Sequence, residues 1–215
     1  MENVVTNYQI KEKKIIHEGF GKLESWTVSD GEKEYDREVF DTGNAVAAII
    51  KDTTKNKFIF VEQHRAATEG VMVEIVAGKI DKGEKPEQAM KREIMEETGY
   101  KVDLITPIMD FYSSPGRMTE VVSLFYCEVS EKINEGGGIG DENVSIVEIE
   151  KLGLGGKIFP QDPFNTEMKM GEEGKIIPPY QLIDAKSIIA VMWYEKNEVL
   201  KEVAEVITHA KLRSL

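Results

Sequence analysis

The chain has 215 residues, of which 41% are hydrophobic and 31% are charged. This length and composition suit one globular domain with a small accessory layer and exclude a disordered chain. The formal net charge of -12 argues against a nucleic-acid partner, because a phosphate backbone is bound by clustered Lys and Arg. A substrate that carries phosphates would therefore need divalent cations to offset its charge.

The sequence contains a single cysteine, Cys127, so an internal disulfide is excluded and a reducing compartment is favoured. Cys127 lies inside a strand-like run and is expected to be a small buried residue. The first residues lack the apolar run of a signal sequence, and no run reaches the length of a membrane span. We therefore expect a cytoplasmic protein without a membrane partner.

Residues 1–42 are expected to form an antiparallel β-sheet. Strand-like runs at residues 26–28 and 35–40 flank Ser29-Asp30-Gly31-Glu32, and Asp-Gly is a strong hairpin turn signal. The segment has too few apolar residues for a core of its own. We expect it to pack on the main domain or on a second subunit, as a dimerisation layer.

The remaining residues, 43–215, predict a second unit that mixes strands and helices. Short apolar runs predict strands, which lie at residues 45–50, 58–61, 71–76, 108–112, 121–129 and 144–149. Pro86 in a first helical turn and Gly99 after Thr98 predict the start and the end of a helix. Gly136-Gly137-Gly138 predicts a flexible loop. Residues 151–180 predict an irregular insertion. Residues 184–201 predict an amphipathic helix with a break near Lys196-Asn197, and residues 202–212 predict its continuation or a second helix.

Three carboxylates gather on the predicted helix that follows Pro86. Glu93, Glu96 and Glu97 are spaced by three and four residues and therefore share one helical face. Like charges at this spacing destabilise a helix by about 0.2–0.5 kcal/mol per pair. Taken alone, the cluster would be read as a solvated acidic face, but the residues around it indicate a different role.

The cluster is part of a longer pattern, G-x5-E-x7-R-E-U-x-E-E-x-G-U, in which U is a bulky aliphatic residue. Every fixed position is present: Gly78, Glu84, Arg92, Glu93, Glu96, Glu97 and Gly99. Only the last position departs, since Tyr100 replaces an aliphatic residue, and this change is expected to affect packing and not chemistry. The segment resembles the Nudix hydrolase box. The resemblance implies an α/β fold, an α/β/α sandwich with a mixed sheet, for residues 43–215.

The resemblance also implies roles for the residues of the box. Glu93, Glu96 and Glu97, with the backbone carbonyl of Ala77, would bind Mg²⁺ or Mn²⁺, since hard oxygen ligands suit these ions. Glu96 is assigned to catalysis with Arg92, which would orient a box glutamate by ion pairing. Gly78 and Glu84 would support the loop of the box. Glu142, in the segment that follows the triple glycine, is expected to be the general base.

Segments outside the box resemble the branch of this family that hydrolyses ADP-ribose and nucleoside diphosphate sugars. They are Arg37-Glu38-Val39-Phe40 before Gly43-Asn44, Glu62-Gln63-His64-Arg65, Glu74-Ile75-Val76-Ala77-Gly78, and Ser114-Pro115-Gly116 with Glu120. Arg37 and Arg65 are expected to meet a diphosphate or a sugar, because a guanidinium fork matches oxygen pairs. The substrate-binding assignment also includes Ser114, Gly116 and Glu120. The alternative for these charged side chains is a surface role.

The resemblance leaves the substrate open. The segment that leads into Gly78 favours ADP-ribose, whereas the triple glycine before Asp141-Glu142 favours GDP-mannose. Either reaction would give a nucleoside monophosphate and a sugar phosphate. A homodimer is expected, because this branch exchanges its N-terminal sheet between subunits and the arginine that matches Arg37 can reach the partner's site. A binding module without activity is the alternative of another class, although such modules usually lose box glutamates.

Overall fold

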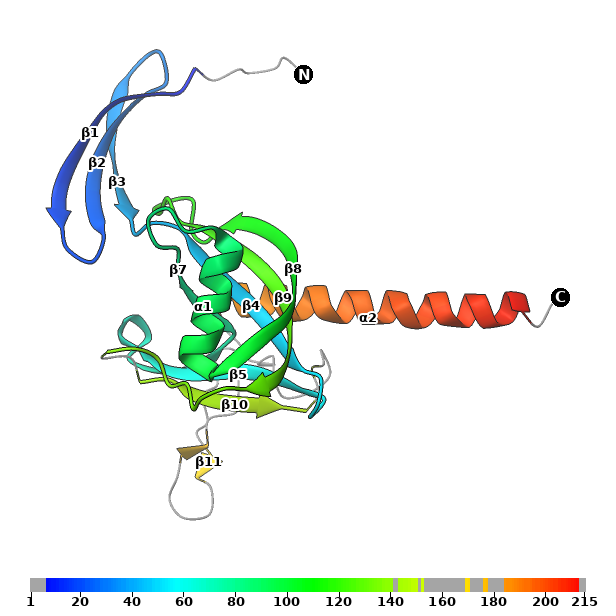
Figure 1. Ribbon diagram of the computed structural model, residues 1–215. Coiled ribbons are helices and arrows are strands. Elements are labelled where there is room, and N and C mark those ends of the chain that lie inside the picture. Colours follow the sequence, from blue (N-terminus) through cyan, green and yellow to red (C-terminus); the bar gives the residue numbers. More distant parts are fainter. Residues whose placement is uncertain are drawn as a thin grey trace.

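The structure is a computed structural model of the chain, and Figure 1 shows its arrangement. It describes residues 7–140, 143–150, 152, 169–170, 176–177 and 184–212. The expected general base, Glu142, and most of the insertion predicted at 151–180 lie outside the described residues. None of the described helices is both long and apolar enough to cross a membrane.

A seven-stranded sheet forms the centre of the main domain. Its strands are β4 (Ala45–Asp52), β5 (Lys57–Arg65), β6 (Gly70–Glu74), β7 (Val76–Lys79), β8 (Tyr100–Tyr112), β9 (Val121–Lys132) and β10 (Ser145–Ile149). The order is β10-β5-β4-β9-β8, with β6 paired to β5 and β7 paired to β4. Strands β4 and β9 run parallel and the other pairs are antiparallel, so the sheet is mixed. A short 3₁₀ helix (Ala66–Thr68) joins β5 to β6, and β11 (Lys169–Met170) pairs with β12 (Ile176–Ile177) outside this sheet.

Two helices cover opposite faces of the sheet: α1 (Pro86–Thr98) and α2 (Ala185–Leu212). Strand β4 shows why, because its successive side chains point to opposite faces and both sets are apolar. Val46 and Ile50 pack in one core cluster with Met90 of α1, while Ile49 packs in a second cluster with Val191 of α2. All five side chains are fully buried. The predicted α/β/α sandwich is therefore confirmed.

Helix α1 begins and ends where its sequence predicts. Pro86 is its first residue, and Gly99 ends it in the left-handed conformation with φ 74°. The Gly99 N–H donates to the carbonyl of Met95 at 3.0 Å, which satisfies one carbonyl of the last turn. The break predicted in α2 is wrong: the helix continues through Lys196-Asn197, and the Asn197 amide donates to the carbonyl of Trp193 at 2.8 Å.

The N-terminal residues form the predicted antiparallel sheet, in the order β1 (Gln9–Glu18), β2 (Lys22–Ser29) and β3 (Glu34–Asp41). Figure 1 shows it projecting from the main domain. Every residue of β1 is exposed, and Ile10, Ile15 and Ile16 are 47%, 51% and 53% exposed. The sheet therefore has no core of its own, as its composition indicated.

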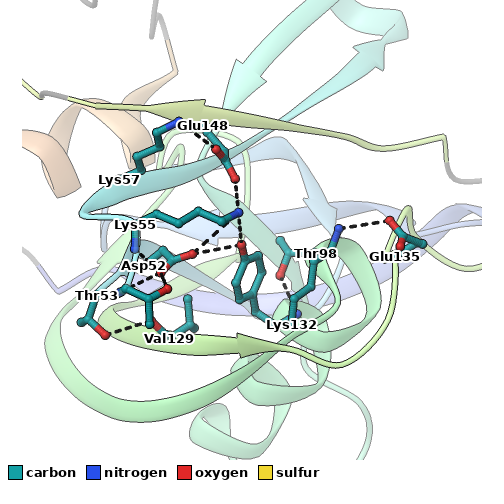
Figure 2. A network of polar contacts seen from close by, with 11 residues as sticks. Asp52, Thr53, Lys55, Lys57, Thr98, Val129, Lys132, Glu135 and Glu148 are labelled. Atoms are coloured by element: carbon teal, nitrogen blue, oxygen red, sulfur yellow. Dashed lines mark hydrogen bonds and ion pairs between the residues drawn. The ribbon is translucent and has the colours of Figure 1, made fainter.

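Tyr100, where the chain departs from the box pattern, lies in a buried polar network. Its hydroxyl donates to Oδ2 of Asp52 at 3.0 Å and accepts from Nζ of Lys55 at 2.9 Å. Lys55 also donates to Glu148 of β10 at 2.6 Å, and Figure 2 shows this lysine between Asp52 and Glu148. Asp52 is 0% and Tyr100 2% exposed. The departure thus does more than change packing, because the tyrosine hydroxyl joins the β4–β5 turn to the start of β8.

Removing the Tyr100 hydroxyl is expected to destabilise the fold. Burial raises the pKa of Asp52, but hydrogen bonds from Thr54, Lys55 and Tyr100 outweigh burial and hold the pKa below its ordinary value. The ionised carboxylate therefore contributes stability above about pH 4, which is lost as the pH falls through its lowered folded-state pKa. Tyr100→Phe is expected to cost about 1–3 kcal/mol at pH 7.

Urea unfolding at pH 7, followed by acid titration of the folded signal, tests this expectation. Tyr112→Phe is the matched control, because that tyrosine ends the same strand and is 60% exposed. Tyr100→Phe should lower the urea midpoint and begin to unfold at a higher pH than the control. Equal midpoints and equal acid transitions for the two variants would show that the network does not stabilise the fold.

Cys127 is fully buried in the core cluster on the α1 face, as expected for a small apolar residue. Burial raises the pKa of its thiol to about 12. A thiol in this state has almost no thiolate at neutral pH, so Cys127 is not a candidate nucleophile.

Candidate active site

Arg92 ties together the carboxylates of the box. Its guanidinium donates to both oxygens of Glu84 at 3.1 and 2.9 Å, to Glu93 at 2.7 Å and to Glu96 at 3.2 Å. A further N–H donates to the carbonyl of Lys79 at 2.9 Å. The hydrogen bond from Arg92 holds the pKa of Glu84 below its ordinary value. One cation thus offsets the repulsion among three carboxylates and connects helix α1 to strand β7.

Gly78 leaves the space that the Glu93 carboxyl group occupies. A Cβ built on Gly78 would overlap that carboxyl group, so no larger residue fits without moving Glu93. Glu93 is only 8% exposed, and Glu97, one turn further along the helix, is 4% exposed. A glutamate of α1 therefore lies directly against the strand that contains Ala77, the residue whose carbonyl the box pattern nominates as a metal ligand.

The triple glycine is bonded to the C-terminal end of α1. The N–H of Gly137 donates to the carbonyl of Glu97 at 2.9 Å, and the N–H of Gly138 donates to that of Glu96 at 3.1 Å. Gly136 has φ 69°, and a Cβ on it would lie 2.5 Å from the Glu97 carbonyl oxygen. The sequence predicted a flexible loop here. In the structure, the glycines allow the loop backbone to lie close to the end of α1, where its N–H groups satisfy the last carbonyls of the helix.

These residues fit a divalent cation. Carboxylates from α1 and the backbone of β7 offer the hard oxygen atoms that Mg²⁺ and Mn²⁺ prefer. Across the described part of the chain, no three His, Cys, Asp or Glu side chains are gathered as a ready metal cage. A full cage is not required of this donor set, because Mg²⁺ usually keeps several waters and binds through one or two carboxylates plus substrate phosphates.

Two of the predicted substrate-binding segments lie side by side although they are far apart in the sequence. The N–H of Phe40 donates to the carbonyl of Arg117 at 2.8 Å, and the N–H of Thr119 donates to the carbonyl of Phe40 at 3.3 Å. The Thr42 hydroxyl donates to Glu120 at 3.3 Å, and the Thr119 hydroxyl donates to Asp41 at 2.8 Å. Thr42, Asp41 and Thr119 were missed by sequence reasoning, because threonines and a lone aspartate in loops carry no pattern.

The predicted substrate residues have different surroundings. Arg65 forms a two-point ion pair with Glu74, at 2.7 and 3.0 Å, and Glu74 also pairs with Lys186 at the start of α2. Burial raises the pKa of Glu74, but these cations outweigh it and hold the pKa below its ordinary value. Arg65 thus anchors the strand that leads to Gly78, and its side chain remains 40% exposed. Arg37 is exposed on β3, with its guanidinium carbon 4.3 Å from the ring centroid of Tyr35.

Ser114 and Gly116 form an exposed turn before Glu120. The carbonyl of Ser114 accepts from the N–H groups of Arg117 at 3.0 Å and Met118 at 2.8 Å, which closes the turn. A Cβ on Gly116 would meet nothing within 4 Å. The turn therefore presents open space at Gly116, four residues before Glu120, whose side chain accepts from the Thr42 hydroxyl.

Comparisons with known proteins agree with this geometry. The model of the NUDIX domain matches residues 41–168. A GDP-mannose pyrophosphatase of Cronobacter sakazakii is 34% identical over 156 residues, which cover 66% of this chain and 81% of that protein. One from Escherichia coli O9:H4 is 30% identical over 183 residues, covering 81% and 85%. The crystal structure of an ADP compounds hydrolase superposes with a TM-score of 0.56 at 19% identity, covering 66% of this chain and 77% of that one.

Proposed function

Because this chain belongs to the Nudix hydrolase family, we propose that it hydrolyses the pyrophosphate of a nucleoside diphosphate sugar. Water would attack one phosphorus, the bond to the bridging oxygen would break, and a nucleoside monophosphate and a sugar phosphate would leave. The observation that carries the proposal is the complete box, in which Arg92 holds Glu84, Glu93 and Glu96 beside strand β7. A module that only binds nucleotides has no need of such a carboxylate set.

Members of this family generally use divalent cations, and we propose Mg²⁺, with Mn²⁺ as the alternative. Glu93, Glu96, Glu97 and the Ala77 carbonyl would hold it. When bound, such a cation polarises a phosphoryl oxygen and lowers the pKa of a water molecule. The contribution of Arg92 is to keep the carboxylates of Glu93 and Glu96 aimed at one place through its bonds of 2.7 and 3.2 Å.

Glu142 is proposed as the general base, which would take the proton of the attacking water. Its assignment rests on the family resemblance and on the neighbouring triple glycine, which is bonded to the end of α1. Arg37, Arg65, Ser114, Gly116 and Glu120 are proposed to bind the substrate. The contacts between residues 37–44 and 113–120 support this set, because they bring two of its segments to one place.

Two substrates are candidates within this class. ADP-ribose is favoured by Glu74-Ile75-Val76-Ala77-Gly78, the segment that leads into the box. GDP-mannose is favoured by the relatives at 30–34% identity, which are named as GDP-mannose pyrophosphatases, and by the triple glycine. Both sugars are joined to a nucleoside through the same diphosphate, so one hydrolytic site serves either reaction.

We further propose that the protein is a cytoplasmic homodimer in which residues 1–42 form the dimerisation layer. The half-exposed isoleucines of β1 support this, because a partner would remove them from water. A sheet edge with unpaired N–H and C=O groups also favours exchange with a second copy.

A substrate panel tests the proposed function. ADP-ribose, GDP-mannose, ADP-glucose and a dinucleoside polyphosphate would each be incubated with Mg²⁺, and the products would be identified by chromatography. Release of a nucleoside monophosphate and a sugar phosphate from ADP-ribose or GDP-mannose is expected. Tight binding of both sugars without any product would instead favour the binding module.

A further inference from the structure

Lys79 is a cation at the candidate active site that the box pattern does not assign. It is the last residue of β7 and follows Gly78 directly. Its Nζ donates to the backbone carbonyl of Thr42 and lies 4.1 Å from the ring centroid of Phe20. The side chain is half-buried, so it is held in one place by a carbonyl on one side and an aromatic face on the other.

Lys79 differs from several half-buried lysines of this acidic chain, although Lys51 also forms no ion pair among the described residues and donates to the Tyr194 hydroxyl at 3.3 Å. Lys57 pairs with Glu148 and Lys186 pairs with Glu74 and Asp184, whereas no carboxylate of the described residues forms an ion pair with Lys79. An ammonium group has three N–H donors. The described residues give this group one hydrogen-bond acceptor, so N–H donors remain for an anion.

The position of Lys79 fits a phosphate of the substrate. In a strand, residues two apart point to the same face, so the side chains of Lys79 and Ala77 leave β7 on the face opposite Glu93, which Gly78 faces. The place of the Lys79 ammonium group relative to the substrate-binding segments is therefore given by its bond to Thr42. The carbonyl that binds Lys79 belongs to Thr42, whose hydroxyl donates to Glu120. The ammonium group therefore lies where the strand of the box meets the two proposed substrate-binding segments.

We propose that Lys79 binds a non-bridging phosphate oxygen of the nucleoside diphosphate sugar. This proposal rests on the proposed function for the identity of the ligand. Its N–H donors would form a charge-assisted hydrogen bond to the phosphate in the ground state as well as during the reaction. A contact of this kind supports substrate binding and leaves the chemical step nearly unchanged.

The test compares Lys79→Met and Lys79→Arg with Lys82→Met, which removes an exposed lysine of the same box loop. Steady-state kinetics on the best substrate of the panel gives KM and kcat, and calorimetry with GDP and ADP gives Kd without turnover. Lys79→Met is expected to raise KM and Kd roughly 10-fold or more, the effect of losing one hydrogen bond to a charged group. Its kcat should stay within about 3-fold, and Lys79→Arg should recover most of the affinity.

Values of KM and Kd for Lys79→Met that equal those of Lys82→Met would overturn the proposal. So would a variant whose kcat and melting temperature fall while Kd is unchanged, since that pattern belongs to a structural lysine. Should the wild-type protein cleave no member of the panel, the proposed reaction fails. The calorimetric comparison would then still decide whether Lys79 binds a diphosphate.

Discussion

Glu97→Gln is expected to lower kcat by at least about 100-fold while the protein stays folded. Mutating a residue that only supports a metal ligand typically lowers metal affinity or activity by about 10–100-fold. Removing a proposed ligand should therefore lower activity by at least the upper value. Glutamine has the shape of glutamate, and Glu97 is 4% exposed on a helix whose end is bonded to the triple glycine. The change therefore removes a charge and leaves the packing.

Steady-state kinetics and thermal melting measure the two parts of this expectation. Glu87→Gln is the matched control, because it removes the same charge from an exposed position of the first turn of α1. Binding of Mn²⁺, followed by its paramagnetic resonance signal, should weaken in Glu97→Gln and not in the control. A Glu97→Gln variant with wild-type turnover would mean that this carboxylate has no part in the reaction.

Gly78→Ala is expected to lower kcat about as strongly as Glu97→Gln, also without unfolding the protein. A Cβ at this position would overlap the carboxyl group of Glu93, which is the far end of a flexible side chain. Glu93 would turn away, lose its 2.7 Å bond to Arg92, and no longer lie against β7. The variant would therefore lose the geometry of the site and not its stability, and a misplacement of about 1 Å can lower the reaction rate roughly 100-fold.

Gly70→Ala provides the control for Gly78→Ala. A Cβ on Gly70 would make only an ordinary contact, 3.6 Å from the Thr68 carbonyl oxygen, and Gly70 begins another strand of the same sheet. Activity assays and melting curves of both variants are required. If Gly78→Ala keeps wild-type kcat, the approach of Glu93 to the strand is not needed for catalysis.

Local signals in the sequence were sufficient for helix α1. Proline in the first turn and glycine after the last turn act through the backbone of the same few residues, so they hold whatever the rest of the chain does. The hairpin of β2 and β3 was predicted for the same reason, from Asp30-Gly31. The spacing of Glu93, Glu96 and Glu97 in the box likewise predicted that their side chains share one face of this helix.

Contacts between distant residues were beyond the reach of these signals. The Tyr100 hydroxyl meets Asp52, 48 residues away, and Lys79 meets the carbonyl of Thr42, 37 residues away. Such pairs depend on the parallel pairing of β4 with β9 and on the return of β7 alongside β4, which no local pattern specifies. The continuity of α2 past Asn197 is a local feature in contrast, because the Asn197 amide donates to the carbonyl of Trp193, four residues earlier in the same helix.

The central claim is that α1 and β7 form a hydrolytic site for a nucleoside diphosphate sugar, and one measurement tests it most directly. The wild-type protein and Glu97→Gln would be incubated with ADP-ribose and with GDP-mannose, with Mg²⁺ or with excess EDTA, and the products separated by chromatography. We predict a nucleoside monophosphate and a sugar phosphate from the wild-type protein with Mg²⁺, and almost none from the variant or with EDTA. Equal product from both proteins with Mg²⁺ and with EDTA, or no product in any reaction, would contradict the account.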